Sequence, residues 1–418
     1  MPQVVQDDEV SSHPAITERI AAAGRELASS FADLVQSTPG RPLTPQDLAR
    51  AVGVNKDLAH RLMSALRKRD PLATVYLMPG PEPLRRFLIA IGKKGARAEH
   101  IHRAEVAVCS FDSLIKNAAG DRSGLDAIIS ASLPDMRARF ESTAKQLVFR
   151  GMRQLKGVAA DVTFFTAILH PSLAGQRHAL VMLRGYLGLH RVRPGATFKM
   201  GVVSGGNDPI AKPFTLAREP IGDPRGVLLT AFCSGPPVEL HVHTKAQDLV
   251  YALCWGDSVG RNSVRDLVMA ELRPDAMRQH RSSEDPRPKA GLTNAIAVPT
   301  RRYIFDLILH AEAYPGWAPT ARILETGELG SADPNDMTRD LDVLDVAERV
   351  DPMGWGIERF RAEEIPRYLE LLQYVCDNLH WDPQRFRGYR VRIEYPIFGS
   401  QVQVAFDVPV ASAPAEAT

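Results

Sequence analysis

The side chains best suited to recognition chemistry in the first hundred residues recur on one face of a predicted helix. They are amide, cationic, carboxylate, imidazole and hydroxyl groups at helical spacing: Asn55, Lys56, Asp57, His60, Arg61 and Ser64. Three further cations follow, at Arg67, Lys68 and Arg69. Arginine and asparagine can hydrogen-bond guanine and adenine in a bidentate way, and cations neutralise phosphates. This face is therefore a candidate surface for double-stranded DNA.

Two helices and a tight turn must position that face. Thr44 is a predicted N-cap with Pro45 after it, and Gly53 falls where the chain turns and a positive φ is cheap only for glycine. The second helix is expected around Asn55–Arg67, because apolar residues recur there at steps of three and four: Ala59, Leu62, Met63 and Leu66. The stretch predicts a helix-turn-helix whose second helix has one buried and one exposed face.

These residues resemble a known family. LARAVGVNKDLAHRLMSALRKR resembles the winged helix-turn-helix of IclR-type bacterial transcription regulators, and VYLMPGPEPLRRFL is similar to the strand and helix after such a wing. The resemblance covers residues 31–88 and does not extend to that family's effector-binding domain. It implies binding of double-stranded DNA and a homodimer. An extended segment at Val75–Leu77 also agrees with strand propensity and the prolines that follow.

The charge distribution supports this interpretation. Residues 41–103 contain 13 Lys or Arg against 5 Asp or Glu, whereas residues 323–371 contain 5 against 13. The net charge of +2 therefore conceals a basic segment near the N-terminus and an acidic segment in the C-terminal part of the sequence. Phosphate neutralisation dominates affinity for DNA, so the basic segment favours a nucleic-acid partner.

Composition limits the class of protein. The chain has 418 residues, 44% of them hydrophobic and 24% charged, which is typical of a globular protein with more than one domain. Its four cysteines form no CxxC pair, and no stretch of about 18 apolar residues could span a membrane. The polar, acidic start of the sequence lacks the features of a signal peptide. We expect a cytoplasmic protein that does not enter a membrane.

The predicted fold is multidomain α+β. Hydrophobic spacing is helical up to about residue 156, and β-rich runs with Gly and Pro turns follow. Strands are predicted at 226–232 and 341–350 among others, and a hairpin is predicted around Phe398–Ser400. Five segments are expected: a disordered tail at 1–13, an all-helical winged helix-turn-helix domain at 14–95, a helical linker or dimerisation region at 96–158, a mixed α+β effector or assembly domain at 159–408, and a disordered tail at 409–418.

Two histidine pairs are candidates for a metal site. His241 and His243 alternate on a predicted strand, as do His310 and Glu312 on another, so each pair shares one strand face. If the two strands were neighbours, the four side chains could bind a metal ion. Nothing in the sequence makes them neighbours, and a solvated strand face is the favoured interpretation. No metal or cofactor is expected.

Two loops lack the residue spacing that a nucleotide-binding or calcium-binding site would need. The glycine-containing segment 202–208 has neither the dinucleotide pattern nor the P-loop pattern, and a simple turn is favoured. The acidic run 332–351 lacks the glycine and glutamate of a calcium-binding EF-hand loop. A capped loop that leads into a strand is favoured there, with Asp340, Asp342 and Asp345 as surface charge or as partners for a basic surface elsewhere in the dimer.

The sequence therefore predicts a dimeric DNA-binding transcription regulator rather than an enzyme. The α+β part would bind a small-molecule effector of unknown identity or mediate assembly. An alternative is a protein-interaction or assembly protein that uses the helical hairpin as a contact surface. A metal-dependent enzyme on the α+β part is a further alternative.

Overall fold

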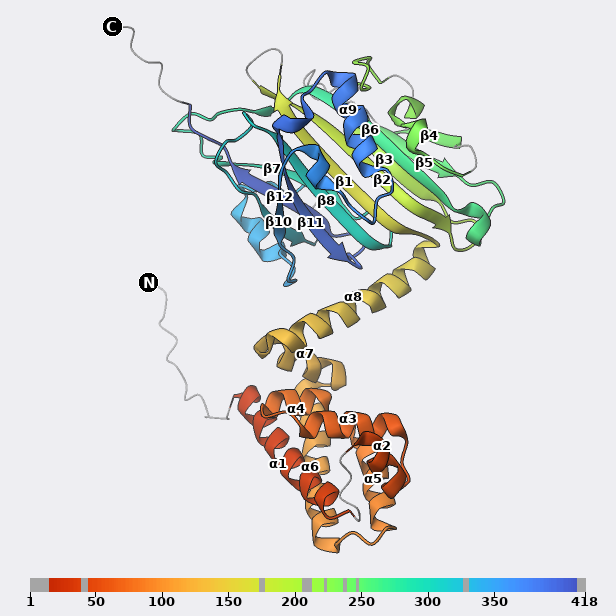
Figure 1. Cartoon of the computed structure of the whole chain (residues 1–418), viewed down its shortest axis with the longest axis vertical. Helices are drawn as coiled ribbons and strands as arrows, with labels where there is room; N and C mark the ends of the chain where they lie inside the picture. Colours follow the sequence, from red (N-terminus) through yellow and green to blue (C-terminus); the bar gives the residue numbers. More distant parts are fainter. Residues whose placement is uncertain are drawn as a thin grey trace, which may run out of the picture. The chain divides into compact units, whose positions relative to one another are not determined.

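The computed structural model of the chain describes residues 15–38, 44–172, 177–204, 213–221, 224–235, 239–245, 248–325 and 331–411. The chain divides into two compact units, Met1–Glu141 and Ser142–Thr418 (Figure 1). The predicted tail at 1–13 and most of the one at 409–418 lie outside the described residues. A helical region over residues 16–156 precedes a β-rich region, which confirms the α+β class.

The first unit is built from helices around one core. Their bounds are α1 Ile16–Gln36, α2 Pro45–Val52, α3 Lys56–Leu66, α4 Pro71–Leu77, α5 Pro81–Gly92, α6 Ala98–Leu114 and α7 Arg122–Ser132, with a π-helical turn at Ile115–Ala119. The helix α8, Pro134–Lys156, crosses the division between the units. Apolar residues from α1 to α7 share one cluster, in which Leu27, Phe31 and Phe87 are fully buried. Burial of such side chains contributes about 1.5 to 3 kcal/mol each.

The helices α1 and α4 approach each other closely at a glycine. A Cβ atom on Gly24 would lie 2.3 Å from the carbonyl oxygen of Pro71. Only the absence of a side chain at Gly24 therefore allows the two backbones to meet there.

The predicted wing is wrong, because residues 71–77 form α4 and not a strand. The Asp70 side chain caps this helix by accepting from the backbone N–H groups of Leu72 (2.7 Å) and Ala73 (3.4 Å). Pro71 lies at the start of α4, where a missing N–H costs nothing. Burial of Val75 in the core then outweighs its strand propensity.

The next helix also begins with proline. Pro81 starts α5, so the proline-rich stretch predicted as a turn is the first turn of a helix. Among the described residues before Val158 there is no strand at all. The helix-turn-helix therefore stands without a wing.

The second unit centres on a six-stranded mixed sheet in the order β10-β11-β8-β1-β2-β6. The strands are β1 Val158–Pro171, β2 Arg177–Arg191, β6 Arg265–Arg278, β8 Thr300–His310, β10 Val350–Trp355 and β11 Phe386–Glu394. The two central strands β1 and β8 pair in parallel, and the other neighbours pair antiparallel.

Both faces of this sheet are covered. The helix α9, Tyr368–Leu379, packs Leu372 and Val375 against one face, which contains Phe164 and Ile304. A three-stranded sheet in the order β7-β12-β9 packs on residues of the opposite face; its strands are β7 Lys289–Ala295, β9 Thr320–Leu324 and β12 Gln401–Asp407. A second three-stranded sheet, β3-β5-β4, contains β3 Phe198–Ser204, β4 Glu239–Lys245 and β5 Asp248–Cys254. Figure 1 shows α9 lying across the large sheet.

Three local predictions in this unit are wrong. The strands on either side of Phe398–Ser400 form no hairpin, because β11 pairs with β8 and β10 while β12 pairs with β7 and β9. The turn there takes the chain from one sheet to another. Residues 226–232 contain short 3₁₀ turns, and residues 337–342 form another, capped by Asp336. The Asp336 side chain accepts from the Thr338 N–H and stabilises the 3₁₀ turn at 337–342, which overlaps the start of the predicted strand.

Candidate nucleic-acid interface

The helix-turn-helix is fixed by local hydrogen bonds at three points. The Thr44 hydroxyl caps α2 by accepting from the backbone N–H of Asp47 (3.2 Å). Gly53 ends α2 at φ +82°, and its N–H donates to the carbonyl of Ala49 (2.9 Å). The Asn55 side chain caps α3 by accepting from the N–H of Asp57 (2.8 Å). Thr44 and Gly53 thus occupy the cap and turn positions predicted from the sequence, and the Asn55 cap is an addition from the structure.

The two helices bury the predicted inner faces. Leu48 and Val52 of α2 and Ala59, Leu62 and Met63 of α3 belong to the core. Leu66 is half-buried, and its neighbour Ala65 is fully buried in its place. The inner stripe therefore follows the helical spacing with a shift of one residue at its end.

The outer face of α3 is open to solvent. Its exposed side chains are Lys56, Asp57, His60 and Arg61, with Asn55 before them and Arg67, Lys68 and Arg69 after them. Ser64 is half-buried. Within the part of the chain that the structure describes, Lys56, His60 and Arg61 have no ion-pair partner within 4 Å. The structure thus gathers the predicted residues on one surface. Within the described residues, Lys56, His60 and Arg61 have no ion-pair partner there.

Two of the predicted residues have constraints that the sequence did not reveal. The Oδ1 atom of Asn55 is occupied as the cap of α3, so only its amide N–H₂ is available to a ligand. Arg61 lies within electrostatic range of the Arg122–Asp126 ion pair, where it lowers the pKa of the Asp126 carboxyl while desolvation raises it.

Arg122 of α7 holds the end of α4, the helix that follows α3. Its guanidinium donates to the carbonyl oxygens of Val75 (3.0 Å), Tyr76 (2.6 Å) and Met78 (3.2 Å), which are at the end of α4. Cations at a helix C-terminus satisfy carbonyls that lack a partner within the helix. Arg122 is a structural cation, in contrast to the exposed cations of α3.

One arginine close to this surface was missed from the sequence as a site residue. Arg86 on α5 is exposed and lines a groove that also contains Asn55, Asp57 and Arg61. The resemblance placed Arg85 and Arg86 together in the helix after the wing, where the two neighbouring arginines look equivalent in the sequence. Only the positions of their partners separate them.

The second unit does not assemble the four-residue metal site considered above. His241 is on β4 and His310 ends β8, and these strands belong to different sheets. The Glu312 carboxylate accepts from Arg385 (2.6 Å), and the His310 ring packs 4.4 Å from that of His170. In the residues covered by the structure, no three His, Cys, Asp or Glu side chains are placed to hold a metal ion.

The structure describes all of the acidic run but only part of the glycine-containing loop. The segment 202–208 lies mostly outside the described residues. The acidic run 332–351 contains the capped turn and then leads into β10.

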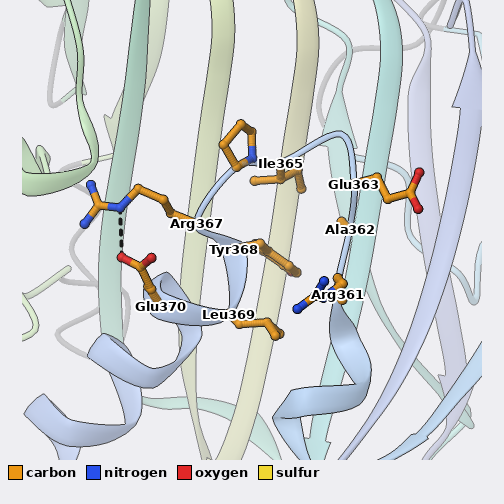
Figure 2. Close-up of a pocket in the computed structure, with 9 residues that line it drawn as sticks. Arg361, Ala362, Glu363, Ile365, Arg367, Tyr368, Leu369 and Glu370 are labelled. Carbon is orange, nitrogen blue, oxygen red and sulfur yellow. Dashed lines mark hydrogen bonds and ion pairs between the residues drawn. The ribbon is translucent and has the colours of Figure 1, made fainter.

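A cavity of about 320 Å³ lies at the first turn of α9 (Figure 2). Arg367 and Glu370 point toward each other there and form an ion pair of 2.8 Å. The Tyr368 hydroxyl donates to the buried Asp306 carboxylate (2.6 Å), which raises the pKa of Tyr368 together with burial. These groups are satisfied within the chain, so we assign no catalytic role to them.

Beneath this cavity is a buried ion pair. Arg390 donates to both carboxylate oxygens of Asp306, at 2.7 and 2.6 Å, and the two side chains are 1% and 0% exposed. Arg390 also donates to the carbonyls of Phe360 (2.7 Å) and Arg361 (2.8 Å). The hydrogen bonds that the structure records for the Arg390 guanidinium thus all end on groups of the second unit.

No protein-family model, curated protein or solved structure matches the chain. No helix in the described residues is long and apolar enough to cross a membrane.

Proposed function

We propose that the protein is a DNA-binding transcription regulator that inserts α3 into the major groove of double-stranded DNA. One observation carries the proposal: a capped helix-turn-helix buries the inner face of α3 and leaves Lys56, His60 and Arg61 exposed and unpaired. Side chains of this kind hydrogen-bond base edges and phosphates. Asn55, Asp57 and Ser64 lie beside them, and Arg67, Lys68 and Arg69 extend the surface toward the DNA backbone.

The proposal includes a homodimer. One recognition helix reads only a few base pairs, and two-fold symmetry doubles the recognised sequence. The second unit would then bind a small-molecule effector or hold the dimer together. The likeness of the α3 region to IclR-type regulators agrees with this proposal, without the wing.

The test is a binding titration on duplex DNA. Fragments bound by the full chain are first selected from random duplex DNA, and two-fold symmetry in the selected sequences would indicate a dimer. The selected duplex is then titrated with the wild type and with a variant that carries Lys56→Ala and Arg61→Ala. We expect the variant to lose at least about thirtyfold in affinity, since each good base contact contributes about 1 to 3 kcal/mol.

A matched control removes the same charge from the same unit. Lys93→Ala with Lys94→Ala deletes two exposed cations at the end of α5 and should retain most of the affinity. Equal circular dichroism melting curves for the three proteins exclude unfolding as the cause. Wild-type affinity in the Lys56 and Arg61 variant would contradict the proposal.

A second candidate function has its own observation. The groove beside α3 is partly apolar, with Val54, Leu58, Pro79 and Pro83 in its lining. Apolar grooves between helices also bind partner proteins. A protein-binding hairpin predicts no salt-dependent affinity for any duplex, whereas a DNA-binding one predicts a steep loss of affinity with salt.

A further inference from the structure

A groove of about 420 Å³ separates α3 from α5 in the first unit. Asn55, Asp57 and Arg61 lie on the α3 side, and Pro83 and Arg86 lie on the α5 side. Figure 1 shows α2, α3 and α5 beside one another in this unit. Two guanidinium groups from different helices thus line one groove at the start of the proposed recognition helix.

The two neighbouring arginines of α5 have different environments. Arg85 pairs with Asp112 of α6 (2.6 Å) and with Glu82 (2.7 Å), and these hydrogen bonds raise its pKa. Arg86 is one residue further, about 100° around the helix, and faces the groove. Within the described ranges it has no ion pair or side-chain hydrogen bond. Arg85 therefore joins α5 to α6, and Arg86 has no such role.

The groove is cationic on balance. Arg61 and Arg86 outnumber the single carboxylate of Asp57 among its charged lining residues. Repulsion between two guanidinium groups is relieved when an anion binds near them, and a phosphate accepts two parallel N–H bonds from each arginine. A phosphodiester is thus a suitable ligand for Arg86 in this groove.

We infer that Arg86 contacts a backbone phosphate of the same duplex that α3 reads, an inference that rests on the proposed function. A helix inserted in the major groove has sugar-phosphate strands on both sides, so the element beside it lies over a strand. In this protein that element is α5, which lines the groove beside α3. Arg86 then supplies affinity without sequence preference, and Arg61 supplies sequence preference.

The experiment compares salt dependence among single variants of the full chain. Affinity for a selected duplex is measured by fluorescence anisotropy over a range of salt concentrations for the wild type, Arg86→Gln and Lys94→Ala. Loss of one phosphate contact should lower the slope of log affinity against log salt by about 0.9. We expect this in Arg86→Gln, with a roughly three- to tenfold loss of affinity that is the same on selected and scrambled duplexes.

The control variants make that result specific. Lys94→Ala removes one exposed cation from the end of the same region and should keep the wild-type slope. Arg86→Lys keeps the charge and should restore most of the slope but only part of the affinity. Arg61→Ala should instead reduce the discrimination between selected and scrambled duplexes.

A second measurement does not depend on affinity. Arginine-selective modification with phenylglyoxal, read by peptide mass spectrometry, should label Arg86 in the free protein and much less when duplex is present. Arg85, which is held in two ion pairs, should react slowly in both states. This result is independent of any effect of a substitution on folding.

The outcomes separate the two proposals. If the wild type binds no duplex, the proposed function and this inference both fail. If the wild type binds but Arg86→Gln keeps its slope and Arg86 stays reactive in the complex, only the inference is overturned. Equal slope changes in Arg86→Gln and Lys94→Ala would also overturn it, because the effect would then be one of general charge.

Discussion

Arginine has opposite roles in the two units of this protein. In the second unit, the Arg390 side chain is 1% exposed. Each hydrogen bond that the structure records for its guanidinium ends on a carboxylate or carbonyl oxygen of the chain. In the first unit, Arg61 and Arg86 are exposed and have no ion-pair partner in the described residues. The contrast teaches that an arginine is a candidate for ligand binding when the fold does not already satisfy it. Stability and recognition should therefore respond to different substitutions.

The largest expected effect is the loss of the buried pair. Arg390→Ala leaves the Asp306 carboxylate buried without its cation, and we expect the free energy of unfolding to fall by about 3 to 5 kcal/mol. Urea denaturation followed by fluorescence measures this. The matched control is Arg302→Ala, whose pair with Glu394 is about half exposed and should contribute less than about 1 kcal/mol. Equal costs for the two variants would remove the contrast between buried and exposed arginines.

Acid should weaken the second unit through two buried histidines. Burial lowers the pKa of His178 and of His310 to about 4. The ring of His178 packs 4.8 Å from that of Tyr314, and nearby His170 and His280 disfavour its protonation further. Around His310, His170 and Arg385 lower the pKa while the carboxylates of Glu312 and Asp382 raise it.

The sign of the pH effect follows from these values. The unfolded histidines, with a pKa near 6.5, bind protons that the folded ones reject, so stability falls as the pH drops from about 6.5 to about 4. We expect a loss of roughly 2 kcal/mol or more in the free energy of unfolding between pH 7 and pH 4.5. Urea titrations at several pH values measure it. The slope should flatten in His310→Gln; an unchanged slope would contradict this assignment.

A smaller effect is expected at the turn of the helix-turn-helix. Gly53→Ala adds a methyl group that would meet no atom within 4 Å, so its cost is the left-handed backbone alone, about 1 to 2 kcal/mol. The control is Gly151→Ala in α8, which adds the same methyl group in open space at a helical φ and should be neutral or stabilising. Chemical denaturation measures both. If Gly53→Ala were as harmless as the control, the turn would not depend on positive φ.

The candidate site could be predicted from the sequence where its structure is local. Thr44 and Gly53 each act within three or four residues of their own position, so their types fix the cap and the turn of α2, whereas the cap that Asn55 forms on α3 was not predicted. The apolar spacing of α3 then determines which face is left open. Arg86 could not be predicted, because its availability depends on Asp112 pairing with Arg85 and not with Arg86.

The fold class could be predicted from the sequence. Individual elements could not be predicted where contacts between residues distant in the sequence determine their structure or pairing. The residues of α4 favour a strand in isolation, but the Asp70 cap and burial against α1 make them helical. The strands β11 and β12 are adjacent in sequence and carry a plausible turn, yet each finds its partners in a different sheet. No short pattern contains that information.

The parallel pairing at the centre of the large sheet also affects how the protein reaches its native state. Val162 pairs with Arg302, so 140 residues separate two partners in adjacent central strands. Closing so long a segment slows folding, whereas Arg103 and Ser29, which are hydrogen-bonded between α6 and α1 in the first unit, are only 74 residues apart. During synthesis the helix-turn-helix can therefore form while the large sheet still lacks β8. For that interval the nascent chain exposes the unpaired backbone edge of β1, a kind of surface that favours aggregation.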